Sequence, residues 1–481
     1  MDKNKINIYW FKRDLRLIDN EALYNATKDS YPILLVYFLD SELVKDKHYS
    51  DIHWNFVKQS ILDINKNFKK PMVLFVKCHT LIGLQKLNDL YNINAIYSHY
   101  ESGIDKTYSI DKKVKLFCDS EGIKWFEYSK NGVKRGLNNR KNWIKEWNKY
   151  VRSEICNPII NDTKLLDPDL IDLPFNRPSL KTPSSTDIQR GGTELALKYL
   201  NSFLDNRISE YTKNISKPYE SRVSCSRLSP YISWGNISSR YIWQRAKKAY
   251  STDKNKFQVN SFLSRLRWNS HFIQRFEMEP RIEFESVNRG YKKLKKPINQ
   301  LFIDAWERGL TGYPLVDASV RCLRQTGYLN FRMRSMIVSF FTHHLWQPWQ
   351  EASHFLARNF LDFEPGIHYS QLQMQAGETG VNTIRIYNPS KNAIERDNNG
   401  LFIIKWLPEL SKIPIPLIFE PWNMSEMEER LYECKLGKDY PKPIVNIINT
   451  RKYASDNLWS MRKDEKVRVE RNRILSKHIN N

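Results

Sequence analysis

The chain has 481 residues and a formal net charge of +23, with 41% hydrophobic and 27% charged residues. This length exceeds what one hydrophobic core organises and predicts two domains. The apolar runs fall short of the roughly 20 residues that cross a bilayer, and residues 1–5 lack the apolar segment of a secretory signal, so membrane and secreted classes are excluded and a cytosolic protein is expected.

Charge and cysteine content restrict the partners. The 76 lysines and arginines exceed the 53 acidic residues, an excess that can neutralise phosphates and favours a nucleic acid. A compositional bias spread over a solvated surface explains the same charge. The cysteines are scattered without a CxxC pair, a pattern that lacks the clustering of zinc and disulfide frameworks, counts against an iron–sulfur cluster and predicts reduced structural thiols and no metal. They are Cys78, Cys118, Cys156, Cys225, Cys322 and Cys434.

Residues 1–130 alternate short apolar runs with helical stretches, which predicts an α/β domain with a parallel, Rossmann-like sheet. Helical periodicity covers residues 50–67, 80–91 and 106–120. The predicted strands are Ile6–Phe11, Ile33–Leu39, Met72–Val76, Ile93–Tyr97 and Lys124–Tyr128. Neither a GxGxxG nor a P-loop motif occurs, so the sheet alone does not indicate a nucleotide.

The pattern changes twice after this domain. Residues 131–190 are rich in proline and polar residues and predict a connector. Residues 191–481 contain long amphipathic, aromatic-rich segments without strand alternation, which predicts an all-α domain that ends in a basic helix over Arg462–Lys477.

Two segments of this domain could bind a ligand. Ser224, Ser226 and Ser229 surround Arg227, and serines at a helix start cap free backbone N–H groups that also hold phosphate oxygens. An ordinary helix cap is the alternative. On the predicted helix Phe262–Phe276, a single face carries Arg265, Trp268, Asn269 and Phe272. Such an aromatic stripe commonly belongs to the hydrophobic core, but a core would have to provide hydrogen-bond partners for Arg265 and Asn269.

Longer motifs around these segments are similar to those of a known family. The N-terminal run Ile6–Leu17, INIYWFKRDLRL, and the string SRLSPYISWG at residues 226–235 resemble the photolyase/cryptochrome family over nearly the whole chain, as a divergent bacterial-type relative of class I photolyases. The resemblance implies an FAD-binding helical domain. It assigns cofactor contacts to Tyr211, Cys225, Ser226, Arg227, Leu228, Ser229, Arg265, Trp268, Asn269, Phe272, Arg334, Asp362, Glu364 and His368.

The run from Thr311 to Arg334 is similar to the most recognisable helix pair of this family. The resemblance implies that Arg334 pairs with Asp362 over the flavin, since a guanidinium fork matches a carboxylate. Glu364 would hold the imide edge of the ring or the adenine. A buried structural salt bridge is the alternative for the Arg334–Asp362 pair. Cys225, Arg265, Asn269 and Phe331 depart from the pattern of repair enzymes.

Three residues receive catalytic roles by resemblance. Trp268 matches the tryptophan against which a flipped pyrimidine dimer packs. Trp349 matches the middle member of the family's tryptophan electron chain, whereas Leu372 occupies the flavin-proximal position, so photoreduction could use Tyr369 or Trp346. His368 stands where repair enzymes carry asparagine beside flavin N5, and could donate a hydrogen bond or a proton. The alternative is a structural histidine whose ring nitrogens find hydrogen-bond partners within the core.

His343 and His344 are adjacent, so they point to different faces of a helix and are interpreted as structural. Residues 100–103 lie where the family holds an antenna of folate or deazaflavin type, whose presence the sequence does not decide.

The leading hypothesis is a monomeric photolyase that uses FAD to split cyclobutane dimers in DNA, flipping the lesion beside Trp268. The alternatives are a cryptochrome-like blue-light photoreceptor that binds FAD without repair, and a DNA-binding protein without a cofactor.

Overall fold

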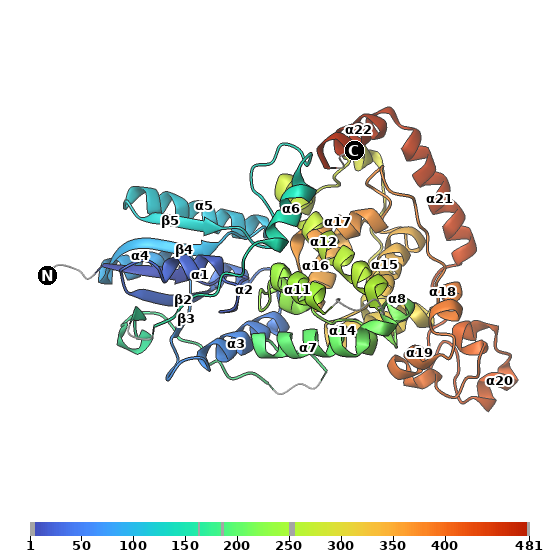
Figure 1. Cartoon of the computed structure of the whole chain (residues 1–481). Coiled ribbons are helices and arrows are strands. Elements are labelled where there is room, and N and C mark those ends of the chain that lie inside the picture. Colours follow the sequence, from blue (N-terminus) through green and yellow to red (C-terminus); the bar gives the residue numbers. More distant parts are fainter. Residues whose placement is uncertain (1–4, 162–163, 184–186, 250–254, 479–481) are drawn as a thin grey trace.

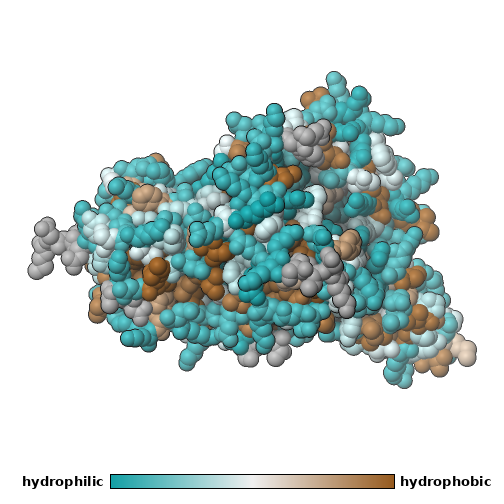
Figure 2. All heavy atoms as spheres, in the orientation of Figure 1, coloured by the Kyte–Doolittle hydropathy of each residue, from teal (hydrophilic) through white to brown (hydrophobic). Residues whose placement is uncertain are grey.

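A computed structural model describes residues 5–161, 164–183, 187–249 and 255–478 (Figure 1). The outer ends of the two predicted domains, residues 1–4 and 479–481, lie outside this part of the chain. Within the described residues, no helix has both the length and the apolar composition that a membrane span requires. Hydrophilic side chains cover most of the face in Figure 2.

The N-terminal part is a five-stranded parallel sheet in the order β3-β2-β1-β4-β5, as predicted. Its strands are β1 (Lys5–Trp10), β2 (Ile33–Asp40), β3 (Val73–Cys78), β4 (Asn92–His99) and β5 (Lys124–Tyr128). The helices between them are α1 (Glu21–Ala26), α2 (Ser41–Val44), α3 (Asp51–Asn65), α4 (Thr80–Leu90) and α5 (Asp105–Ser120).

Alternate residues of the strands enter two different cores because successive side chains point to opposite faces. Ile8 and Val36 pack with apolar residues of α4 and α5. Tyr9 and Leu35 face a second core that includes α3 and continues into the helical part of the chain. The sheet is therefore covered on both sides, which fits its nearly continuous apolar strands.

After a mostly irregular connector, the chain from residue 191 onward is helical, as predicted, and folds back on itself beside one end of the sheet (Figure 1). The remaining α-helices are α6 (Trp143–Arg152), α7 (Thr193–Asp205), α8 (Tyr211–Asn214), α9 (Ser221–Ser224), α10 (Ser229–Ser233), α11 (Ser239–Lys248), α12 (Lys256–Met278), α13 (Gln300–Arg308), α14 (Pro314–Thr326), α15 (Phe331–Ser339), α16 (Trp349–Asn359), α17 (Pro365–Gln375), α18 (Pro389–Arg396), α19 (Leu401–Trp406), α20 (Glu426–Leu431), α21 (Ile447–Lys463) and α22 (Glu465–His478).

The segment after β1 joins the two parts. Arg240 of α11 forms an ion pair with Asp19 at 2.6 Å, and both side chains are buried. Gly235 has a φ of 76°, and a Cβ at this position would lie 2.2 Å from the carbonyl oxygen of Arg13. Only glycine permits both the left-handed backbone and this close approach. The two segments that carry the family resemblance thus pack directly against each other.

The helix prediction is wrong in two places. Helix α6 lies within the predicted connector, where Trp143, Trp147 and Val151 form a buried stripe at four-residue spacing. The basic helix predicted over Arg462–Lys477 is broken at Asp464, whose ψ of 134° is extended. The Asp464 carboxylate accepts the N–H of Lys466 at 2.8 Å and so starts α22.

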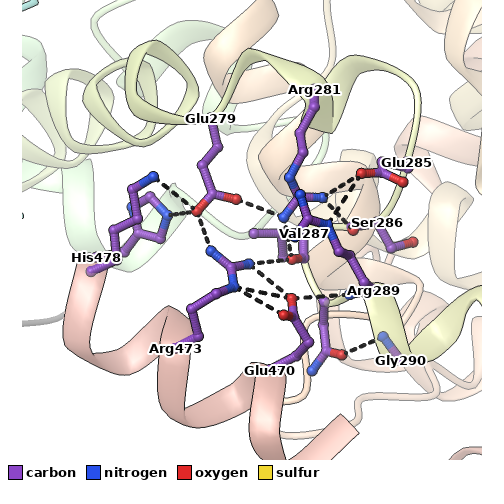
Figure 3. A network of polar contacts seen from close by, with 12 residues as sticks. Glu279, Arg281, Glu285, Ser286, Val287, Arg289, Gly290, Glu470, Arg473 and His478 are labelled. Atoms are coloured by element: carbon purple, nitrogen blue, oxygen red, sulfur yellow. Dashed lines mark hydrogen bonds and ion pairs between the residues drawn. The ribbon is translucent and has the colours of Figure 1, made fainter. Parts of the chain in front are cut away.

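Helix α22 returns to the end of α12 through a network of charged residues (Figure 3). The Glu279 carboxylate accepts hydrogen bonds from Arg473 at 2.5 Å and from His478 at 3.0 Å. Arg473 also donates to the carbonyl of Val287 at 2.8 Å. These contacts fix the last helix against the helix that carries Trp268.

Candidate functional site

Arg334 and Asp362 form a bidentate pair, as predicted. Arg334 Nη1 and Nη2 donate to Asp362 Oδ1 and Oδ2 at 2.9 and 2.8 Å, and Arg334 Nε donates to the carbonyl of Leu329 at 2.8 Å. The guanidinium lies 4.1 Å from the centre of the Phe360 ring. Nε, Nη1 and Nη2 of Arg334 each donate a hydrogen bond to one of these acceptors. The orientation of the guanidinium beside Asp362 is therefore fixed, and the pair is rigid.

Glu364, two residues later, points to the N-terminal part of the chain. Its Oε2 lies 3.6 Å from Arg13 Nη1, and Arg13 Nη2 donates to the carbonyl of Phe363 at 2.5 Å. Burial raises the pKa of Glu364, against the opposing effect of Arg13 and Lys130. Arg13 was missed as a site residue, although it belongs to the N-terminal run that carries the resemblance.

The serine-rich turn lies between α9 and α10. Arg227 has a positive φ of 58°, and its guanidinium lies 3.8 Å from the centre of the Tyr328 ring. The predicted serine cap is wrong, because Leu228 is the N-cap residue of α10 and no side chain caps the helix. Within this turn, the N–H of Leu228 donates to Ser226 Oγ at 3.5 Å, whereas the N-cap residue itself supplies no side-chain acceptor to the first turn of α10.

Two further residues assigned by resemblance flank this turn. Cys225 is buried, and its carbonyl accepts a hydrogen bond from Arg207. Tyr211 is also buried, with its ring 5.6 Å from Phe203 and 6.0 Å from Phe262. Their roles toward a cofactor remain predictions.

The predicted face of α12 contains both exposed and buried groups. Trp268 is 46% exposed, and its ring centre lies 5.7 Å from that of Phe272. Arg265 lies 5.2 Å from the ring centre of Phe331, which belongs to α15. Asn269 Oδ1 is buried without a hydrogen-bond partner in the described part of the chain. An orphaned buried acceptor is costly and is commonly satisfied by a ligand or water.

His368, on α17, is a neutral ring. Burial is the main reason that its pKa is lowered to about 3. Its Nε2 lies 3.0 Å from the carbonyl oxygen of Ser353, which can only accept, so Nε2 carries the hydrogen. The other ring nitrogen, Nδ1, is then an acceptor. The predicted contact with flavin remains a prediction, but this tautomer favours acceptance of a hydrogen bond at Nδ1.

Trp349 begins α16 and is fully buried. Its Nε1–H donates to Ser286 Oγ at 3.1 Å, and Ser286 donates to Glu378 at 2.7 Å. Its ring centre lies 6.1 Å from that of Tyr369. Leu372, at the position where the family has its flavin-proximal tryptophan, is buried on α17.

The paired histidines are structural, as interpreted from the sequence. His343 contacts Ser339 Oγ at 2.9 Å, whereas His344 contacts Thr450 Oγ1 at 2.9 Å and the Tyr387 carbonyl at 2.8 Å. Across the described residues, no group of three or more histidine, cysteine or acidic side chains is arranged to hold a metal ion.

A cavity of about 50 Å³ lies at the carboxyl ends of β1 and β2. Lys12, Arg13, Asp40 and Glu101 line it together with aromatic side chains, and Glu101 belongs to the predicted antenna segment. This volume accommodates a few water molecules. A folate or deazaflavin would require displacement of the lining rings, so the second chromophore is not assigned.

The helical site fits a flavin nucleotide. It combines the rigid Arg334–Asp362 pair, the uncapped turn before α10, and the orphaned acceptor of Asn269. Two buried nitrogens of Arg13, Nε and Nη1, also lack hydrogen-bond partners among the described residues.

Comparisons with known proteins indicate the family of the chain. Residues 7–133 match the family model described as DNA photolyase, and residues 262–460 match the FAD binding domain of DNA photolyase. The chain is 29% identical to a deoxyribodipyrimidine photo-lyase of Alkalihalophilus pseudofirmus, with 94% of this chain and 98% of that protein covered.

Two solved structures share the fold. A Synechocystis cryptochrome has a TM-score of 0.85 at 22% identity, covering 95% of this chain and 99% of its own. A bacterial class III photolyase from Agrobacterium tumefaciens has a TM-score of 0.83 at 22% identity, with 96% and 99% covered.

Proposed function

Because the chain belongs to the photolyase/cryptochrome family and carries its FAD-binding domain, we propose that it is a light-driven photolyase that splits cyclobutane pyrimidine dimers in DNA. The name of the Alkalihalophilus relative supports repair. The basic composition of the chain supports a nucleic-acid partner.

The observation that carries the proposal is the exposed Trp268 ring between charged and aromatic neighbours. Arg265 lies one turn before it on α12, and Arg265 and Arg332 both lie 5.2 Å from the Phe331 ring. Phe331 is itself 37% exposed. Arginine side chains bind phosphates, and exposed indole rings stack on unpaired bases. This combination fits a damaged strand with a base turned out of the helix.

Bound FAD supplies the light-driven transfer of an electron. The residues of this chain bind and orient the reactants. Arg334 and Asp362 would hold the polar edge of the isoalloxazine ring, and the turn at Cys225–Ser229 would bind the pyrophosphate through backbone N–H groups. Trp349 and Tyr369 are buried, and such surroundings would keep water away from a flavin bound beside them. No general base is required, because both cyclobutane bonds break after electron uptake.

A repair assay tests the proposal. Purified protein loaded with FAD is expected to restore thymine-dimer DNA under blue light and not in darkness. A yellow protein that leaves dimers unchanged under illumination would contradict repair.

That outcome would favour the second candidate, a cryptochrome-like photoreceptor. One observation supports this candidate: Arg265 and Phe331, both departures from the pattern of repair enzymes, lie against each other on the face where the lesion would bind.

A further inference from the structure

Two buried arginines come close together where the connector meets α12 and α22. Arg140 of the connector is 5% exposed, and Arg275 of α12 is 6% exposed. Arg140 Nη1 donates to His271 Nδ1 at 2.8 Å, and His271 precedes Arg275 by one turn on the same face of α12. The positive charge of Arg275 acts on Arg140 across this region, so two like charges share one buried place.

The carboxylate of this region is already occupied. Glu279, four residues after Arg275, is the acidic residue whose charge acts on Arg275. Its Oε1 lies 2.5 Å from Arg473 and 3.4 Å from Lys477, and its Oε2 lies 2.7 Å from Arg281 (Figure 3). One carboxylate therefore meets three cationic side chains, and Arg275 is not among its ion-pair partners.

Three buried nitrogens of this region lack hydrogen-bond partners among the described residues: Arg140 Nε, Arg275 Nε and His478 Nδ1. Arg140 is satisfied in part, because it donates to the His478 carbonyl at 3.3 Å and lies 4.3 Å from the centre of the Trp143 ring. Burial is the main reason that the pKa of each arginine is lowered to about 10, so both remain charged at neutral pH. A buried charge without a counter-charge is costly, and this region is short of an anion.

We propose that this region binds one inorganic phosphate ion, held by Arg140, Arg275 and His478. Arginine donors match the oxygens of phosphate in spacing and charge. His478 Nε2 lies 3.0 Å from the Glu279 carboxylate, which accepts, so Nε2 carries the ring hydrogen and Nδ1 is an acceptor without a donor. Hydrogen phosphate supplies that donor, because it carries an O–H beside its charged oxygens.

The exposure of these side chains favours a free ion over the phosphate of a nucleic-acid strand. Arg140, Arg275 and His478 are at most 6% exposed, and a strand would have to bring its neighbouring nucleotides into the protein with each phosphate. The face proposed for the lesion is a separate surface, where Trp268 is 46% exposed. His271 lies between the two, with its ring centre 4.9 Å from that of Trp268.

A bound phosphate would join the connector, α12 and α22. A ligand that binds only the folded chain stabilises it, by an amount that grows with the logarithm of the ligand concentration above its Kd. Phosphate is therefore expected to stabilise the protein in the absence of DNA.

The first test measures the melting temperature of the full chain loaded with FAD, so that the turn predicted to bind the pyrophosphate is already filled. Sodium phosphate, sodium sulfate and sodium chloride are compared at equal ionic strength. Phosphate should raise the melting temperature most, and sulfate less, because sulfate carries no O–H at neutral pH. Equal effects of the three salts would overturn the proposal, since screening of the net charge of +23 would explain them.

Proton NMR of the histidine rings locates the ion. Phosphate should shift the ring signals of His478 and His271, which are assigned through His478→Gln and His271→Gln. Signals that stay unchanged while the melting temperature rises would place the ion elsewhere and overturn the site. This measurement uses the unaltered protein and does not depend on the folding of a variant.

Calorimetric titration with phosphate tests the arginine. Arg275→Gln should weaken binding about ten- to a hundredfold, because it removes a charge-assisted donor. Arg275→Lys keeps the charge without the fork and should have an intermediate affinity. Arg321→Gln is the matched control, since its Nη1 is already paired with Glu409 at 2.7 Å, and it should bind phosphate normally. Unchanged affinity in Arg275→Gln would overturn the proposal.

Thymidine 5′-monophosphate distinguishes a free ion from the phosphate of a nucleotide. It should not compete with phosphate at equal concentration, and competition would overturn the assignment of a free ion. The inference does not rest on repair. A protein that splits dimers without a specific response to phosphate would refute the anion site and leave the repair proposal intact, and a protein that binds phosphate without splitting dimers would do the reverse.

Discussion

Arg334 and Asp362 meet through two parallel hydrogen bonds although 28 positions separate them in the chain. Helix α15 carries the guanidinium, and the carboxylate lies between α16 and α17. Phe363 and Glu364 follow directly and contact Arg13, so the pair is also held by the N-terminal part of the chain.

Asp362→Asn tests whether this pair holds the cofactor. The variant keeps the shape of the side chain but removes its charge, and one charge-assisted hydrogen bond contributes about 1.5–3 kcal/mol. We expect FAD to bind about ten- to a hundredfold more weakly, measured by flavin absorbance after dialysis. Glu127→Gln is the control, since it alters an Arg135–Glu127 pair at 3.0 Å on the sheet domain. Unchanged flavin content in Asp362→Asn would refute the assignment.

Trp268→Ala tests the proposed contact with the lesion. Removal of an exposed stacking ring costs about 1–3 kcal/mol per base. Affinity for thymine-dimer DNA should therefore fall about five- to a hundredfold in a fluorescence anisotropy titration, while flavin content stays constant. Trp459→Ala, which removes a 50% exposed indole from α21, should bind dimer DNA normally. Equal affinities of the two variants would place the lesion elsewhere.

Glu279→Gln tests the network that holds α22. Removal of one partner from a buried ion pair costs about 3–5 kcal/mol, because the remaining charge loses its partner. The free energy of unfolding, measured with urea, should fall by that amount. The control is Glu433→Gln, which alters an ion pair whose side chains are 58% and 70% exposed. This variant should change the free energy of unfolding little. A stable Glu279→Gln variant would show that α22 is held by apolar contacts.

The same carboxylate predicts an acid dependence. Burial alone raises the pKa of Glu279, but hydrogen bonds from His478 and Arg473 outweigh it and hold the pKa well below the ordinary value of 4.5. Its contribution to stability is therefore present above pH 4.5 and is lost as the pH falls further toward the folded-state pKa. Glu279→Gln should flatten the acid limb of a plot of stability against pH. An acid limb identical to that of the unaltered protein would contradict this account.

Arg13→Gln and Glu364→Gln compare the two sides of one contact. Arg13 is buried, donates to the Phe363 carbonyl and lies 4.5 Å from the centre of the Trp234 ring. Its loss should cost about 3–5 kcal/mol. Glu364→Gln should cost less, because burial raises the pKa of Glu364 and already disfavours its charge. Urea unfolding of both variants measures the difference, and a larger loss in Glu364→Gln would reverse the interpretation.

Local patterns predicted most of the fold. The five strands and the helices α3, α4 and α5 were predicted because apolar periodicity is a property of neighbouring residues. Helix α6 was missed because prolines dominate the residues that follow it. The break at Asp464 was missed because one N-cap aspartate is a weak signal in a charged segment. The serine cap failed for a different reason: the chain enters α10 through Leu228.

The sequence by itself determined the two-part architecture and the family motifs, because these depend on residues close together in the chain. The tertiary structure decided the partner of each polar side chain. Glu364, whose contact with a cofactor remains a prediction, lies beside Arg13 of the N-terminal part, and Tyr369 meets His48, which is 321 positions away. Such pairings depend on how the helices fold back over the edge of the sheet. Local periodicity does not predict contacts between residues that lie so far apart in the chain.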